Sequence, residues 1–242
     1  TKLNADLESD GNKLNFNQMK LMKTSGFVEL HDFIDTQNEP LLNLRITSSG
    51  LKADDIDHLT QYFRNVSGDV SINGRITGPL SDARIITQNQ LSHFQIENLK
   101  LPNSQLESEL NKKYFKASGQ IFGRQIQTDF KIPFAENEPY VIKAKMTDFQ
   151  PLLLLPLIGL PLPNYDVKSH LSGNIDLQTT RNSFEQINGK VMIDQLALER
   201  GPQTLKLTAP TEMIFKDHLT TMTPMNLMGP DQNLSVKLKN QN

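Results

Sequence analysis

The sequence predicts an all-β protein whose antiparallel strands have one apolar side and one polar side. Three observations predict this class. Most of the 242 residues fall into short runs in which apolar and polar residues alternate, the period of a half-buried strand. A Ser-Gly dipeptide followed by a strand-like run recurs along the chain, and so does one hexapeptide pattern.

The hexapeptide pattern occurs at residues 16–21, 96–101 and 193–198. In each copy the apolar residues are first three and then two positions apart, so strict alternation slips by one residue. A one-residue slip sends the following side chains to the opposite face unless a bulge or a tight corner absorbs the extra residue. We therefore expect a repeated bulge or corner in a long β-structure.

The first strands can be placed from the beginning of the chain. Leu3, Ala5 and Leu7 alternate with polar residues, and alternation resumes after Asp10-Gly11-Asn12, which predicts a hairpin. This strand-like beginning has no targeting segment, so we expect the sequence to be a piece of a longer chain.

Four Ser-Gly dipeptides open strands, at residues 25–26, 67–68, 118–119 and 172–173. Glycine suits a tight turn or a bulge, and a β-branched residue two positions after the glycine suits the inward side. After the first opening, Val28 and Leu30 are expected on the apolar side, with Phe33 as a further candidate.

The later runs keep the period of two, with one side apolar and the other polar. This pattern suits antiparallel pairing with one face in water. A closed sandwich or barrel would need the same pattern, with the apolar side as a dry core. Alternation alone leaves both arrangements open.

Two segments depart from the strand pattern, and we expect a short helix in each. Residues 54–63 place Ile56, Leu59 and Phe63 at helical spacing behind acidic residues. The second helix is expected to begin at Thr147 or Asp148 and to lead into an apolar stretch, residues 152–162. That stretch is shorter than the roughly 20 residues of a membrane span and is interrupted by prolines, so we interpret it as a plug or end cap rather than a lipid-contacting element.

These features predict three segments. Residues 1–47 are the tail of one β-repeat unit, residues 48–146 form a unit that opens with a short helix, and residues 147–242 form a unit that opens with the Leu- and Pro-rich helix or plug. Loop lengths differ between the units, as repeats tolerate.

Composition argues against an enzyme, a cofactor, a metal site or a nucleic-acid partner. The net charge is −2 without a basic stripe, and cysteine is absent. The five histidines stand alone in the sequence, and Asp54, Asp55 and Asp57 lack the glycine and distal glutamate of a calcium loop. No catalytic or phosphate-binding motif is present. A carbohydrate-binding module is a further alternative, but the sequence has no tryptophan and only four tyrosines for stacking on sugars.

Three features follow one another in the chain: the Asp-led segment near residue 55, residues 66–80 (VSGDVSINGRITGPL) and the hexapeptide. In this succession the chain resembles the AsmA-like (TamB) superfamily of Gram-negative envelope proteins. It implies an elongated, curved antiparallel sheet folded into an apolar groove (a β-taco), located in the periplasm and anchored in the inner membrane by a segment outside this sequence. It also implies transport of phospholipid acyl chains between the inner and outer membranes. The alternative is a scaffold that assists outer-membrane protein assembly by pairing at a sheet edge, with a β-barrel protein as its partner.

If the sheet is an open trough, the alternating apolar side chains would line it and bind lipid. The expected lining residues are Val70, Ile72, Ile76, Ile126, Phe130, Ile132, Ile142, Ile175, Val191, Ile193, Leu205 and Leu207.

Overall fold

The computed structural model describes residues 2–56, 65–96, 99–152, 155, 167–180, 183–216, 218–230 and 232–238. Strands make up 73% of the protein, and the described residues contain no helix of seven or more residues. The all-β antiparallel class is therefore confirmed. The chain divides into two compact units, unit 1 (Thr1–Gly123) and unit 2 (Arg124–Asn242), which are described separately below. The repeat boundaries expected from the sequence follow a different division and stay a prediction.

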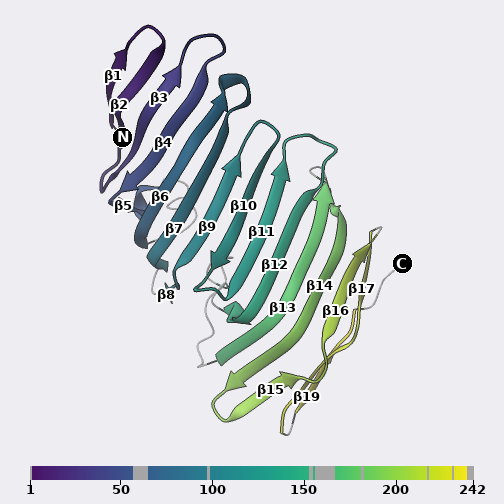
Figure 1. Ribbon diagram of the computed structural model, residues 1–242. Helices are drawn as coiled ribbons and strands as arrows, with labels where there is room; N and C mark the ends of the chain where they lie inside the picture. Colours follow the sequence, from purple (N-terminus) through teal and green to yellow (C-terminus); the bar gives the residue numbers. More distant parts are fainter. Residues whose placement is uncertain are drawn as a thin grey trace. The chain divides into compact units, whose positions relative to one another are not determined.

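Unit 1 is an antiparallel meander in which each long strand pairs with the strands before and after it (Figure 1). The short strands β5 and β8 pair with the ends of β6 and β7. The strands are β1 (Lys2–Ser9), β2 (Lys13–Met22), β3 (Phe27–Asp35), β4 (Leu41–Ser49), β5 (Leu51–Lys52), β6 (Val66–Pro79), β7 (Arg84–Ile96), β8 (Leu99–Lys100), β9 (Ser104–Leu110) and β10 (Tyr114–Ile121). The hairpin expected around Asp10-Gly11-Asn12 joins β1 to β2.

Unit 2 is also antiparallel, and its longest strand, β14, pairs with β13 on one side. On its other side, β14 pairs with β16 over residues 189–193 and with β15 over residues 197–200. The strands are β11 (Ile126–Pro133), β12 (Tyr140–Phe149), β13 (Val167–Thr180), β14 (Ser183–Arg200), β15 (Gln203–Leu207), β16 (Thr211–Lys216), β17 (Leu219–Met222), β18 (Met225–Met228) and β19 (Asn233–Val236).

The hexapeptides lie where the strand ladder is interrupted. In the first copy the register shifts between Phe16 and Met19, and in the third copy Ile193 and Gln195 pair with successive residues, so Asp194 is the extra residue of a bulge. In the second copy Ile96 pairs with Leu99, and residues 97 and 98 lie outside the described residues. The expected bulge is confirmed in the first and third copies.

The Ser-Gly glycines lie where neighbouring backbones come unusually close. A Cβ atom built at Gly26 would lie 2.3 Å from the backbone of the next strand, and at Gly119 or Gly173 it would lie 2.2 Å away. At Gly68 the nearest backbone atom would be 2.9 Å away, next to the register shift between Ser67 and Asp69. Any side chain at these positions would force the strands apart.

The buried core of unit 1 gathers at one end of its sheet. Leu51, Ala53, Val66, Ile96 and Leu101 are buried, and they lie in β5, in the 3-10 turn after it, at the adjoining ends of β6 and β7, and directly after β8. Leu44 in β4 and Ala117 in β10 are buried as well. Figure 1 places β5 and β8 at this same end of the strands. The rest of the sheet is therefore held mainly by its hydrogen-bond ladder and by contacts between neighbouring side chains.

The two expected helices are not confirmed. In the first segment the structure has a 3-10 turn at Ala53–Asp55, and residues 57–64 lie outside the described part. In the second segment, β12 continues through Phe149, and a 3-10 turn follows at Pro151 and Leu152. Most of the expected plug, residues 153–154 and 156–166, also lies outside the described residues.

One strand assignment was wrong. Phe33 pairs with Asn15 and Asn43 on the polar side of β3, while Ile34 lies with Leu30 on the apolar side. The reason is that β3 runs in unbroken register with β4, so its alternation does not slip, and the bulge lies on β2 instead.

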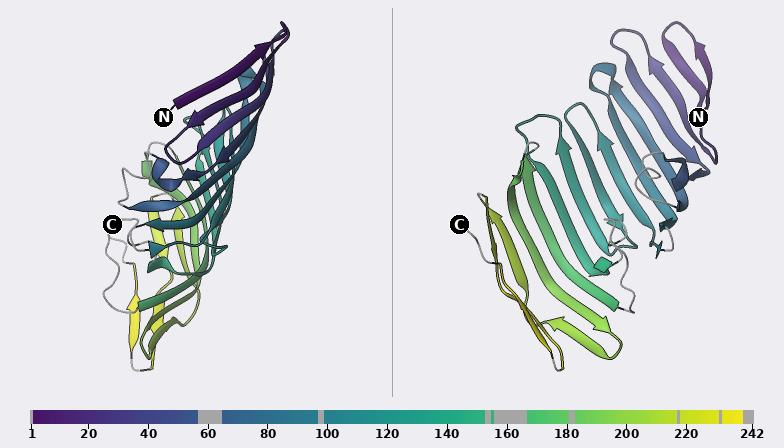
Figure 2. Two further views of the ribbon diagram at one scale, coloured as in Figure 1. Left: turned by 90° about the vertical axis from the view of Figure 1, so that its left-hand side faces the viewer. Right: turned by 180° about the vertical axis from the view of Figure 1, so that it is seen from behind.

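Each unit is a single layer of strands. In neither view of Figure 2 does a helix or a second sheet cover the described strands of a unit. The sandwich or closed barrel that alternation left open is thus absent from the described part of either unit. The description that remains is an open antiparallel sheet.

Candidate functional site: the apolar faces of the sheets

The strand register of unit 1 places the apolar side chains on one face. Residues paired across an antiparallel ladder point to the same side of the sheet. Ile76 pairs with Leu44 and Ile85, and Val70 pairs with Leu51 and Leu91. The face continues through β3 and β2, where Leu30 pairs with Ile46 and Met19. We call this side the apolar face of unit 1 and the opposite side its polar face.

Unit 2 has an apolar face built in the same way. Ile142 pairs with Phe130 and Leu177, and Ile175 pairs with Ala144 and Val191. Ile193 lies on the same face, because it pairs with Gly173, which is two positions from Ile175 on β13. Leu205 pairs with Leu198, and Leu207 pairs with Leu227. Ile126 pairs with Met146, and Ile132 follows Phe130 at the alternating position.

All of the lining residues expected from the sequence therefore lie on the apolar face of one unit or the other. Val70, Ile72 and Ile76 lie on that of unit 1, and the others lie on that of unit 2.

Burial on these faces is incomplete. None of the expected lining residues is fully buried, and Ile142 is exposed at 44%. In a sandwich, a second sheet would cover such side chains.

The apolar face of unit 1 has a polar interruption that the sequence did not indicate. Thr87, Asn89 and Ser108 point to this face from β7 and β9. The Thr87 and Ser108 hydroxyls are 2.7 Å apart, and the Asn89 amide donates to both hydroxyl oxygens at 3.0 Å. The three side chains hydrogen-bond to one another, and such internal pairing of polar groups suits a partly buried position. Thr87 and Asn89 occupy alternating positions like their apolar neighbours, so only the strand register reveals their side.

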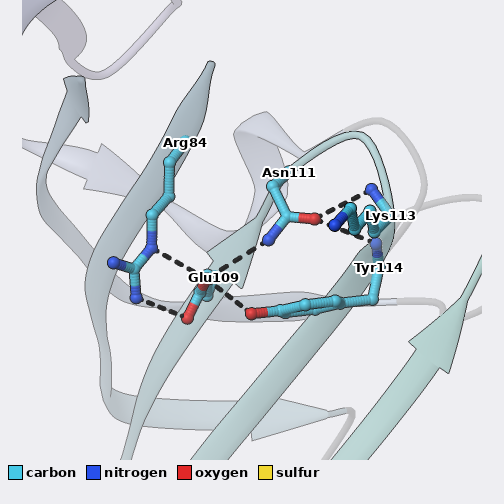
Figure 3. Close-up of polar contacts among 5 residues, drawn as sticks. All are labelled: Arg84, Glu109, Asn111, Lys113 and Tyr114. Carbon is cyan, nitrogen blue, oxygen red and sulfur yellow. Dashed lines mark hydrogen bonds and ion pairs between the residues drawn. The ribbon is translucent and has the colours of Figure 1, made fainter. Parts of the chain in front are cut away.

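The polar faces carry charged side chains in hydrogen-bonded groups (Figure 3). In unit 1 the Glu109 carboxylate accepts hydrogen bonds from Arg84 Nε at 2.8 Å and Nη2 at 2.9 Å, and from the Tyr114 hydroxyl at 2.8 Å. The Arg84 guanidinium, followed by the Tyr114 hydroxyl, lowers the pKa of Glu109. Asn111 also donates to Glu109 and caps the β9–β10 turn, accepting from the backbone N–H groups of Lys113 and Tyr114. This group stabilises the turn.

Three of the histidines each face a carboxylate. His31 Nε2 lies 3.1 Å from Glu29, His93 Nδ1 lies 2.8 Å from Asp69, and His170 Nδ1 lies 2.6 Å from Asp148. Among the described residues, no group of three or more His, Asp or Glu side chains is arranged to hold a metal ion. His58 lies outside the described residues.

Asp55, from the acidic segment, caps the 3-10 turn at Ala53–Asp55 and not the longer helix expected from the sequence. Its carboxylate accepts a hydrogen bond from the Ser25 hydroxyl and one from the backbone N–H of Lys52. The Ser25 bond is the main reason that the pKa of Asp55 is lowered. Asp55 therefore ties the 3-10 turn to the first Ser-Gly opening.

In the part of the chain that the structure describes, no helix is both long and apolar enough to span a bilayer. No family model, curated protein or solved structure matches this chain. The resemblance to the AsmA-like proteins therefore rests on the sequence motifs alone. The feature that the described residues offer for binding is the apolar face of each unit.

Proposed function

We propose that this chain is a periplasmic segment of an AsmA-like protein that binds lipid acyl chains and serves phospholipid transport between the inner and outer membranes. The observation that carries the proposal is the apolar face of each unit, which no second layer covers within the described residues. Soluble proteins rarely expose large continuous apolar surfaces without a ligand or partner for them.

Hydrocarbon is the ligand that such a face suits best. Each methylene that moves from water onto an apolar wall gains about 0.8 kcal/mol, so a few methylenes provide several kcal/mol without any directional contact. Successive strands present similar side chains, so neighbouring positions would bind an acyl chain almost equally well. A chain could then slide along the face over small barriers.

The proposal includes a groove formed by bending of the sheet toward its apolar face. Gly74, Gly119 and Gly173 occupy positions on the apolar faces. A Cβ atom at any of them would lie 2.2 Å from a carbonyl oxygen of the neighbouring strand. Backbones that approach this closely on one side support a bend toward that side, and glycine is the residue that allows the approach.

The test is a charge scan on β11, read by native mass spectrometry of gently purified protein. Aspartate at Ile126, Phe130 or Ile132 should abolish retention of co-purified phospholipid, because each places a carboxylate on the apolar face. Gln127→Asp is the control, since Gln127 is exposed and pairs with Lys145 on the polar face. Equal losses on both faces, or no lipid in the wild type, would count against the proposal.

The alternative is a scaffold that assists outer-membrane protein assembly by pairing at a sheet edge. An unpaired strand edge is a template for a strand of another protein. The exposed strand β1 is the element to test. A photo-crosslinker at Asp6 would then capture an outer-membrane β-barrel in cells, whereas one at Lys145 would not. Equal capture at both positions would argue against edge pairing.

A further inference from the structure

Two arginines face each other on the polar face of unit 1. Arg45 on β4 and Arg75 on β6 are direct partners in the strand register, and both are exposed. They line an open hollow of about 400 Å³. Around them the hollow is lined by Thr47, Thr77, Asn73 and Gln88, and also by the apolar residues Ile46 and Ile86.

This pairing carries an electrostatic cost that the described residues offset only through one long ion pair, at Arg45. Like charges directly opposite each other on a sheet are destabilising. The best contact of Arg45 is Nε at 3.8 Å from the Asp32 carboxylate, with both side chains well exposed. His31 is the partner of Arg45 on its other side, and its Nε2 lies 3.1 Å from the Glu29 carboxylate. Within the described residues, no carboxylate forms an ion pair with Arg75.

We propose that Arg45 and Arg75 bind a phosphate group in this hollow. A guanidinium group presents parallel N–H donors that match two oxygens of a phosphate, and two such groups on adjacent strands can hold one phosphate from two sides. The surrounding hydroxyls and amides supply further donors. A bound dianion would also relieve the repulsion between the two arginines. Because the site is on the polar face, it does not depend on acyl-chain binding by the apolar face.

The phosphate could come from a soluble phosphate compound or from a lipid headgroup, and two measurements separate these sources. Calorimetry at low salt would titrate the 242-residue chain with inorganic phosphate. Flotation would measure binding to phosphatidylcholine vesicles with and without phosphatidylglycerol. Each would compare wild type with Arg75→Gln and Arg75→Lys. Lys145→Gln is the matched control, because it removes the same charge from the polar face of unit 2.

The Arg75→Gln variant is expected to weaken phosphate binding by about 10-fold or more, because charge-assisted hydrogen bonds are lost. Arg75→Lys should fall between this variant and wild type, since lysine keeps the charge but not the two-donor geometry. Lys145→Gln should stay within about 2-fold of wild type, since Lys145 does not line the hollow. Phosphate should raise the melting temperature of wild type but not that of Arg75→Gln. The same melting curves show whether Arg75→Gln is folded.

Phosphate binding that depends on Arg75 would assign the site to soluble phosphate compounds. Vesicle binding that depends on both phosphatidylglycerol and Arg75, without binding of free phosphate, would assign it to a lipid headgroup. Either result supports the phosphate site. If neither ligand's binding depends on Arg75, or if Lys145→Gln loses as much as Arg75→Gln, the proposal is wrong. Lipid retention by the apolar face is a separate readout, so the two proposals can fail independently.

Discussion

Replacing Ile142 or Ile214 by aspartate tests lipid binding with closely matched variants. Both isoleucines are in unit 2, and they are exposed at 44% and 40% respectively. Ile142 points to the apolar face with Phe130 and Leu177, whereas Ile214 points to the polar face with Lys190. The chemical change and the starting exposure are nearly the same, and only the face differs.

The expected magnitudes follow from these exposures. Full burial of an isoleucine side chain stabilises by about 1.5–3 kcal/mol, so the buried part of either residue contributes about 0.8–1.8 kcal/mol to folding. The two variants should therefore lose similar amounts of stability. A bound acyl chain would cover the exposed part of Ile142, worth about 0.7–1.3 kcal/mol. Placing an unpaired carboxylate against hydrocarbon adds at least about 1–3 kcal/mol of cost.

The sum predicts that Ile142→Asp weakens acyl-chain affinity by about 20-fold or more, at 1.4 kcal/mol for each factor of ten. Ile214→Asp should stay within about 2-fold of wild type, because its face carries no lipid in the proposal. The assay is displacement of a fluorescent fatty acid, with thermal melts to confirm matched stability. If both variants lose affinity equally while both stay folded, the assignment of lipid to the apolar face is refuted.

Three further predictions concern the sheet itself. Gly119→Ala should lower the melting temperature far more than Gly11→Ala. The new Cβ at residue 119 would lie 2.2 Å from the Gln105 carbonyl oxygen, whereas a Cβ at residue 11 would meet open space and only the positive φ disfavours it. Similar losses of melting temperature would contradict the close backbone approach at Gly119. Deleting Asp194 should leave unit 2 folded, because the deletion removes only the extra residue of a bulge. Deleting Met192 should unfold unit 2, because it moves side chains of β14 to the wrong face. Circular dichroism distinguishes the two outcomes. Glu109→Gln should destabilise the protein at neutral pH, and the difference from wild type should shrink as the pH falls below about 4.5, since the folded state lowers the pKa of Glu109 and this stabilisation is lost on protonation. A pH-independent difference in melting temperature would show that the charge of Glu109 is not responsible.

The antiparallel class and the side of most strand residues could be predicted from local sequence. Alternation places Val70, Ile72 and Ile76 together, and the register confirms them on one face. The one-residue slip in the hexapeptide predicted the bulge at Asp194, because the following Leu196 and Leu198 had to stay with Ile193. These features depend on positions a few residues apart, so the sequence pattern contains them.

Other features depend on which strands become neighbours. Thr87 and Asn89 lie on the apolar face because the ladder pairs β7 with β9, which brings Ser108 within hydrogen-bond distance. Arg45 and Arg75 are thirty positions apart in the chain, and only the pairing of β4 with β6 places them opposite each other. Neither contact has a local signal in the sequence.

By itself, the sequence determined that this protein has strands with one apolar and one polar side, and where the alternation is interrupted. Only the tertiary structure decided that each unit is a single open layer instead of a closed sandwich. The physical reason is that side-chain alternation specifies which residues share a face, whereas long-range packing decides whether a second layer covers that face. Both arrangements require the same period of two.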